Sequence, residues 1–141
     1  MLTQSECDIL NSKMIGTMVE ALGIRFLPSD DDVALAEMPI DGRTRQYFGI
    51  LHGGASLTLA ETVAGAGSVH LTGLDEQCLV CGTEVSGTHL AMSPMEGKVY
   101  GKATLLHGGK STHVWNVEIV DEYGNLISVE RVTNRILHKE N

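Results

Sequence analysis

The chain has 141 residues, 43% of them hydrophobic, which supplies one core and predicts a single domain over residues 1–141. Its formal net charge of −8 argues against nucleic acid or an anionic membrane as the main partner. The three cysteines, the lack of a signal peptide and the lack of a long apolar run predict a cytoplasmic protein without a disulfide framework.

Residues 3–22 carry apolar side chains at steps of three and four, and Gly23 is a natural stop. This spacing predicts an amphipathic helix that lies on another part of the fold. Residues 24–27 and 33–38 then predict a pair of strands around the acidic turn at residues 29–32.

An almost wholly apolar segment from about residue 54 to about residue 70 predicts a longer helix, buried at the centre of the fold. Four β-rich segments follow at 77–90, 97–106, 111–120 and 125–137, joined by short loops. Short connections between consecutive strands predict an antiparallel sheet, and a wholly apolar helix needs a sheet curved around it. The predicted fold class is therefore α+β.

Glu61 is the only ionisable residue between Gly53 and Val69. A buried carboxylate costs several kcal/mol unless it has a partner, so a lone acid on an apolar helix is a candidate reactive group. The structural alternative is an ion pair with Arg43 or Arg45.

His52 precedes Glu61 by nine residues. On one helix this spacing separates them by about 13 Å and places them on opposite faces. One compact substrate therefore cannot easily touch both within a single chain. If they share a site, two chains must build it.

The ordered set of Gln46, His52-Gly53-Gly54 and Glu61 resembles the hotdog-fold acyl-CoA thioesterases, in the branch that hydrolyses aromatic acyl-CoA thioesters. The similarity extends over roughly residues 14–138 and includes the segment from His107 to Trp115. It looks closest to the 1,4-dihydroxy-2-naphthoyl-CoA thioesterases and related aroyl-CoA thioesterases, such as those of 4-hydroxybenzoyl-CoA. The resemblance implies an antiparallel sheet wrapped around a long central helix, and hydrolysis of a thioester to a free acid and CoA.

The resemblance also implies a catalytic set of Glu61, Gly53, His52 and Gln46. Glu61 would attack the carbonyl carbon or take a proton from the attacking water, and the sequence does not choose between these roles. The backbone N–H of Gly53 would polarise the thioester oxygen. His52 and Gln46 would orient the reacting group. The alternatives are a helix cap for His52 and a tight turn for Gly53.

Two further groups follow from the resemblance. The residues expected to bind CoA are Gly82, His89, Gly109, Lys110, Ser111 and Thr112. A lysine and two hydroxyl groups beside glycines suit phosphate contacts, although an ordinary polar hairpin is the alternative. The residues expected to line the acyl pocket are Phe48, Thr62, Gly65 and Ala66. Several relatives carry Ser or Thr at position 65 to hold the lytic water, so Thr62 or the backbone would hold it here.

We expect an acyl-CoA partner and a homodimer with shared sites, which itself pairs into a dimer of dimers. No metal and no cofactor are expected, because CoA is part of the substrate. Cys78 and Cys81 would point to opposite faces of a strand as small buried hydrophobes. Two other functions stay open: a dehydratase of the same fold, although its usual Pro-Gly is replaced by Ala60-Glu61, and a non-catalytic acyl-CoA-binding module.

Overall fold

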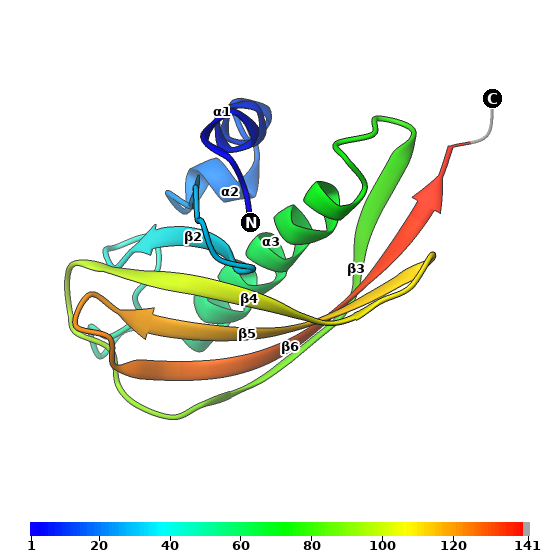
Figure 1. Ribbon diagram of the computed structural model, residues 1–141. Helices are drawn as coiled ribbons and strands as arrows, with labels where there is room; N and C mark the ends of the chain where they lie inside the picture. Colours follow the sequence, from blue (N-terminus) through cyan, green and yellow to red (C-terminus); the bar gives the residue numbers. More distant parts are fainter. Residues whose placement is uncertain (140–141) are drawn as a thin grey trace.

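The computed structural model describes residues 1–139 (Figure 1). Its helices are α1 (Gln4–Lys13), α2 (Met18–Ala21) and α3 (Gly53–Leu71). Its strands are β1 (Arg25–Leu27), β2 (Ala34–Pro39), β3 (Cys78–His89), β4 (Lys98–Gly108), β5 (Thr112–Asp121) and β6 (Leu126–His138). None of the helices in this part of the chain combines the length and hydrophobicity that a membrane span requires.

The strands form one antiparallel sheet in the order β1-β2-β4-β5-β6-β3. The sheet curves around α3, and α1 and α2 lie beyond the same face (Figure 1). The predicted α+β class and the four consecutive strands after the long helix are therefore confirmed.

Helix α3 packs against the sheet through small and branched side chains, among them the fully buried Leu59 and Val63. Gly67 permits the closest approach. A Cβ atom at this position would lie 2.5 Å from the Trp115 ring on β5, and Trp115 is fully buried. The missing side chain thus lets the largest core residue lie directly beneath the helix.

The prediction of one helix over residues 3–22 is wrong. Helix α1 ends at Met14, and α2 begins only at Met18. Gly16 lies between them with φ at +80°, a conformation that an α-helix does not accept. The predicted stop at Gly23 is confirmed, because its φ is +75°.

The prediction that α3 is buried on all sides is also wrong. Its sheet-facing side is buried, but Glu61 is exposed on the other side. The predicted burial of the two strand cysteines fails for a related reason. Cys78 is half-buried and Cys81 is exposed, because β3 is the edge strand of the sheet.

Helix α1 is held in place by polar contacts to α3 and to β1. A Glu6 carboxylate oxygen lies 2.7 Å from Nδ1 of His70, near the end of α3. The Asn11 side chain exchanges two hydrogen bonds with the backbone of Phe26 on β1, at 2.9 and 3.1 Å. These contacts fix α1 as one wall of the space beside Glu61.

Glu130 on β6 is a second acid, and this one is buried. Its Oε1 accepts a 2.6 Å hydrogen bond from the Ser128 hydroxyl, and its Oε2 has no hydrogen-bond partner within residues 1–139. Burial raises the pKa of Glu130 from 4.5 to about 7. The carboxyl group of Glu130 therefore binds its proton more tightly in the folded chain than in the unfolded chain.

The raised pKa of Glu130 predicts a pH-dependent stability with a definite sign. Its contribution is full below pH 4.5 and is lost as the pH rises to about 7, because the charge must then be buried. Glu130→Gln should match the wild type in thermal unfolding at about pH 5 and exceed it at about pH 8. An equal difference in Tm at both pH values would contradict this assignment.

Candidate active site

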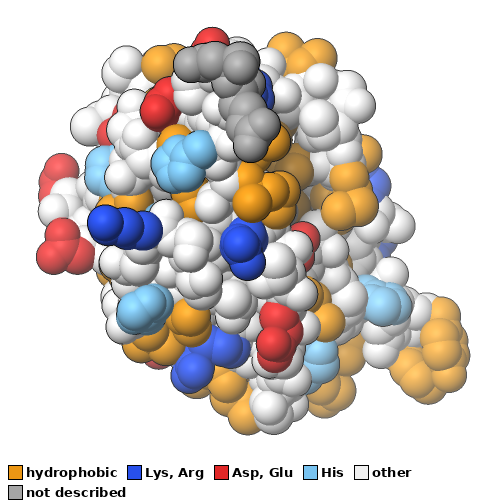
Figure 2. All heavy atoms as spheres, turned by 90° about the vertical axis from the view of Figure 1, so that its right-hand side faces the viewer, with side chains coloured by type: hydrophobic (Ala, Val, Ile, Leu, Met, Phe, Trp, Pro, Cys, Tyr) orange, Lys and Arg blue, Asp and Glu red, His pale blue; other side chains and the backbone are white. Residues whose placement is uncertain are grey.

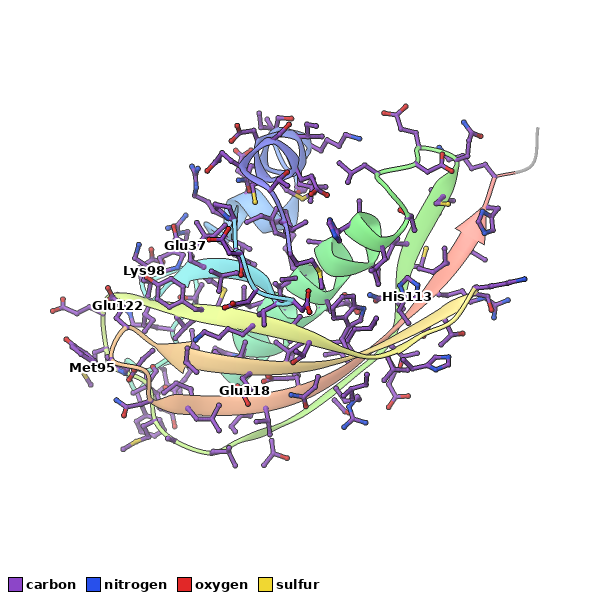
Figure 3. All side chains as sticks on the ribbon, in the orientation of Figure 1. Glu37, Met95, Lys98, His113, Glu118 and Glu122 are labelled. Atoms are coloured by element: carbon purple, nitrogen blue, oxygen red, sulfur yellow. The ribbon has the colours of Figure 1, made fainter. Side chains whose placement is uncertain are left out.

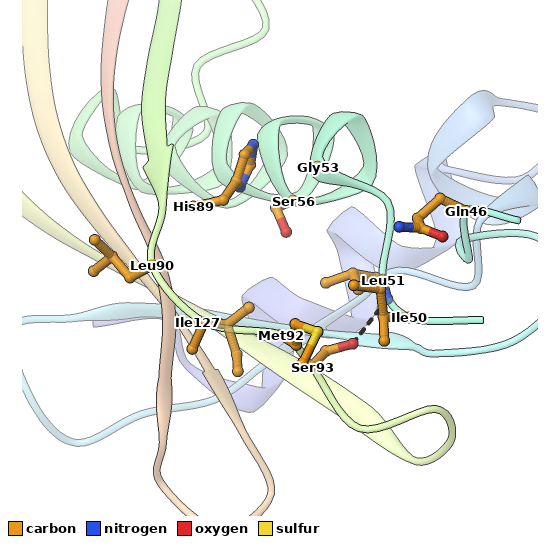
Figure 4. A pocket seen from close by; sticks show the side chains of 11 residues that line it. Gln46, Ile50, Leu51, Gly53, Ser56, His89, Leu90, Met92, Ser93 and Ile127 are labelled. Carbon is orange, nitrogen blue, oxygen red and sulfur yellow. Dashed lines mark hydrogen bonds between the residues drawn. The ribbon is translucent and has the colours of Figure 1, made fainter. Parts of the chain in front are cut away.

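Two of the cavities beside α3 contain the expected catalytic residues. The first, here called the Gly53 cavity, lies at the start of the helix and has a volume of about 350 Å³ (Figure 4). Its residues come from the loop before α3, from the start of α3, from β3 and its following loop, and from β6. They are Gln46, Ile50, Leu51, Gly53, Ser56, His89, Leu90, Ala91, Met92, Ser93 and Ile127.

The second, here called the Glu61 cavity, lies beside the middle of α3 and has a volume of about 250 Å³. Its residues come from α1 and the following segment, from β1, from the outer side of α3, and from β3 and β6. They are Leu10, Met14, Val19, Phe26, Glu61, Thr62, Gly65, Ala66, Val69, Val80, Gly82 and Asn134. The two cavities share no residue.

His52 caps α3. Its Nδ1 accepts a 2.8 Å hydrogen bond from the backbone N–H of Gly54. The Gly53 N–H belongs to the first helical turn and has no intrahelical acceptor. The His89 ring lies against Gly53, since a Cβ at Gly53 would be 2.5 Å from His89 Nε2. The structure thus brings Gly53, His89 and Gln46 together, with His52 as their neighbour on the helix cap.

Gln46 begins a tight loop ahead of this cap. Its backbone N–H donates to the Ile50 carbonyl at 2.9 Å, and its side-chain oxygen accepts from the Phe48 N–H. Tyr47 and Phe48 stack with ring centroids 4.1 Å apart and are both exposed. Phe48 therefore does not line the Glu61 cavity of its own chain, whereas Thr62, Gly65 and Ala66 do.

Gly82 on β3 lies directly against the Glu61 carboxylate. A Cβ at Gly82 would be 2.5 Å from Glu61 Oε1, so a side chain there would displace the acid. Gly82 thus belongs with Glu61. His89 lies seven residues further along β3, about 23 Å away, and lines the Gly53 cavity instead.

The β4–β5 hairpin carries the other residues expected to bind CoA. The Gly109 N–H donates to the Thr112 carbonyl at 2.9 Å, which closes the turn, and Lys110 and Ser111 are exposed. Arg135 on β6 pairs with Thr112 and is also exposed. Figure 2 views this end of the molecule, where Lys, Arg and His side chains are spread among hydrophobic ones.

Sequence reasoning missed Arg135 and Asn134, which the strand register places beside the expected residues. Asn134 pairs with Gly82 on one side and with His113 on the other. These two residues could be identified only from the pairing of β6 with β3 and β5. A linear sequence motif does not contain that information.

The chain matches the model of the thioesterase superfamily over residues 48–128. The chain belongs to the thioesterase superfamily. It is 44% identical to the proofreading thioesterase EntH of Cronobacter sakazakii and to the 1,4-dihydroxy-2-naphthoyl-CoA hydrolase of Escherichia coli. Each alignment covers 92% of this chain and 93% of the relative.

Among solved structures, a thioesterase from Haemophilus influenzae superposes with a TM-score of 0.89 at 33% identity. That match covers 100% of this chain and 94% of the other. The expected hotdog fold and thioester hydrolase activity are confirmed by these relatives, and the substrate is an acyl-CoA. The dehydratase and the non-catalytic binding module are thereby set aside.

The contribution of the His52 cap to stability can be tested. His52→Ala removes the capping acceptor and should destabilise the thioesterase by about 1 kcal/mol. His52→Asn restores a side-chain acceptor for the Gly54 N–H, so its Tm should stay near the wild-type value. Thermal unfolding of both variants checks this, and equal Tm losses would show that the cap adds no stability.

Proposed function

We propose that this thioesterase hydrolyses an aromatic acyl-CoA, and that each active site combines the Glu61 cavity of one chain with the Gly53 cavity of a second copy. The observation that carries the proposal is the separation of the two cavities. One holds the acid and the other holds the helix N-terminus, and neither contains both.

The edge strand β3 offers the way to join them. All of its twelve residues are exposed or half-buried, and β6 pairs with only one of its edges. An unpaired edge of this length readily accepts another strand. Gly82 lies just before the middle of β3 and His89 is its last residue, so antiparallel pairing of two copies, centred between these two residues, would bring the partner's His89 end to Gly82 and Glu61.

The chemistry follows from what each half supplies. The Gly53 N–H and the positive end of the α3 dipole stabilise the negative charge that develops on the thioester oxygen. Glu61 either attacks the carbonyl carbon or takes a proton from the attacking water. Gln46, His52 and the nearby His89 orient the thioester, and Thr62 is the hydroxyl available to hold the lytic water.

The acyl group enters the Glu61 cavity. A cavity of about 150 Å³ in another protein binds benzene, so the 250 Å³ here suits a substituted or bicyclic ring. Gly65 and Ala66 leave space beside Glu61, and Met14 and Phe26 add apolar walls. Lys110 and Arg135, with the Ser111 and Thr112 hydroxyls, offer donors to the phosphates of CoA.

The substrate class predicts an activity pattern. In a thiol-release assay, benzoyl-CoA or naphthoyl-CoA should give a higher kcat/KM than palmitoyl-CoA, because a cavity of about 250 Å³ suits a ring system better than a long acyl chain. Glu61→Gln should nearly abolish turnover with the aromatic substrate. A clear preference for palmitoyl-CoA would overturn the aromatic assignment.

The shared site predicts complementation between two inactive variants. Gly53→Pro removes the N–H while keeping a residue suited to the first helical position, and Gly53→Ala is the matched control that keeps the N–H. Each of Gly53→Pro and Glu61→Gln should be inactive alone. After random subunit exchange, activity should return at about a quarter of all sites.

Both position-53 variants add a Cβ against His89, so a loss caused by that contact would also appear in Gly53→Ala. Subunit exchange is checked separately by mass spectrometry of differently tagged chains. Exchange without recovered activity would mean that Glu61 works with groups of its own chain.

A further inference from the structure

A buried polar cluster links α3 to the end of the β4–β5 hairpin. Its centre is the Ser68 hydroxyl on α3, which lies 2.9 Å from His113 Nδ1, 2.9 Å from Trp115 Nε1 and 3.0 Å from Asn134 Nδ2. His113 projects from β5 on the side of the sheet that carries α3 (Figure 3). All four side chains are buried. One hydroxyl group therefore joins the helix to two neighbouring strands, β5 and β6.

The protons of this cluster can be assigned. Trp115 Nε1 and Asn134 Nδ2 only donate, so the Ser68 oxygen accepts from both and gives its single proton to His113 Nδ1. His113 is then neutral, with its proton on Nε2, and burial lowers the pKa of its ring. The ring also hydrogen-bonds the Gly109 backbone. Because Nδ1 is committed to Ser68, the Nε2–H donates this second hydrogen bond.

His113 stands at the base of the hairpin turn. The turn closes where the Gly109 N–H donates to the Thr112 carbonyl at 2.9 Å. From residue 104 to residue 112 no side chain is buried, and His113 is the first buried residue after the turn. The end of the hairpin thus extends past the hydrophobic core, and side-chain packing against the body of the protein begins at His113.

Asn134 repeats this arrangement on β6. The strand register pairs His113 with Asn134, and it pairs Thr112 with Arg135. Successive residues of a strand point to opposite faces, so the first pair faces α3 and the second pair faces outward. The Ser68 hydroxyl therefore holds both strands directly behind two of the donors that the proposed function assigns to the CoA phosphates.

An exposed hairpin binds phosphates more tightly when its backbone is already ordered. A mobile turn must be ordered as the ligand arrives, and the lost entropy weakens binding. A neutral imidazole suits the ordering role, because it carries one acceptor and one donor. In His113 the acceptor meets a hydroxyl of α3 and the donor meets the backbone of the turn.

We propose that His113 is a positioning residue for CoA: through Ser68 it anchors the β4–β5 hairpin to α3, and so holds Lys110, Ser111 and Thr112 ready for the phosphates. The proposal rests on the proposed function, which assigns the phosphate contacts to these residues. His113 is buried, so it acts on the ligand through the hairpin. Its loss should therefore weaken CoA binding and raise KM, and it should leave kcat nearly unchanged.

The test measures the Kd for CoA by isothermal titration calorimetry, and kcat and KM with benzoyl-CoA. His113→Leu removes both ring nitrogens and should raise Kd and KM on the order of tenfold, with kcat within about twofold of the wild type. Ser68→Ala breaks the same link from the helix and should also raise Kd. His113→Gln should bind CoA nearly as the wild type does, because an amide offers an acceptor to Ser68 and a donor to Gly109.

Asp121→Ala is the matched control. Asp121 is a buried polar residue at the other end of β5, where its carboxylate accepts hydrogen bonds from the backbone N–H groups of Tyr123 and Asn125. This variant should lower Tm and leave the Kd for CoA unchanged. If it raised Kd as much as His113→Leu does, general loss of stability would account for the effect. That result, or a His113→Gln variant as weak as His113→Leu, would refute the role of His113.

A double variant, Lys110→Ala with Arg135→Ala, separates this proposal from the proposed function, because it removes the two charged donors themselves. A raised Kd in the double variant with an unchanged Kd in His113→Leu and Ser68→Ala would refute the positioning role alone. An unchanged Kd in the double variant would overturn the phosphate site on the hairpin, and the positioning role with it. A wild type inactive on benzoyl-CoA would overturn the aromatic substrate, and the comparison of Kd values for CoA would still decide the role of His113.

Discussion

The packing of α3 on one face of the curved sheet is the constraint on which the rest of the molecule depends. Two glycines set how closely helix and sheet approach: Gly67 lies over the Trp115 ring, and Gly101 of β4 lies under Leu59. This contact fixes both ends of a 19-residue helix relative to the strands. The start of α3 therefore meets the His89 end of β3, and its middle meets Gly82.

The same packing explains why Gly53 and Glu61 lie in two separate cavities. A helix presents one face to the sheet, so whatever projects from the other face must be covered by something else. Helix α1 covers the later part of α3 through Leu10 and Met14, which stand in the wall of the Glu61 cavity. The stretch between the two cavities faces the side of the unpaired β3 edge, and the proposed second copy adds its strand there.

Much of the fold could be predicted because strand spacing, turns and apolar periodicity are local properties. The break at Gly16 could not, because apolar spacing on its two sides continues the same helical pattern. The exposure of Glu61 could not be predicted either. An apolar helix sequence does not tell whether other parts of the same chain cover the helix. The contacts of Gly53 with His89, and of Gly82 with Glu61, depend on the register of distant segments. No motif contains that register, and Asn134 was missed for the same reason.

The exposed position of Glu61 also resolves the apparent conflict of a carboxylate on an apolar helix. In the chain alone the carboxylate stays hydrated, so folding does not carry the several kcal/mol that burying an unpaired charge costs. In the proposed dimer the positive end of the partner's α3 dipole approaches as water leaves, and it interacts favourably with negative charge. The acid would then lose its hydration only in the assembled site, beside the positive end of a helix dipole and next to the thioester.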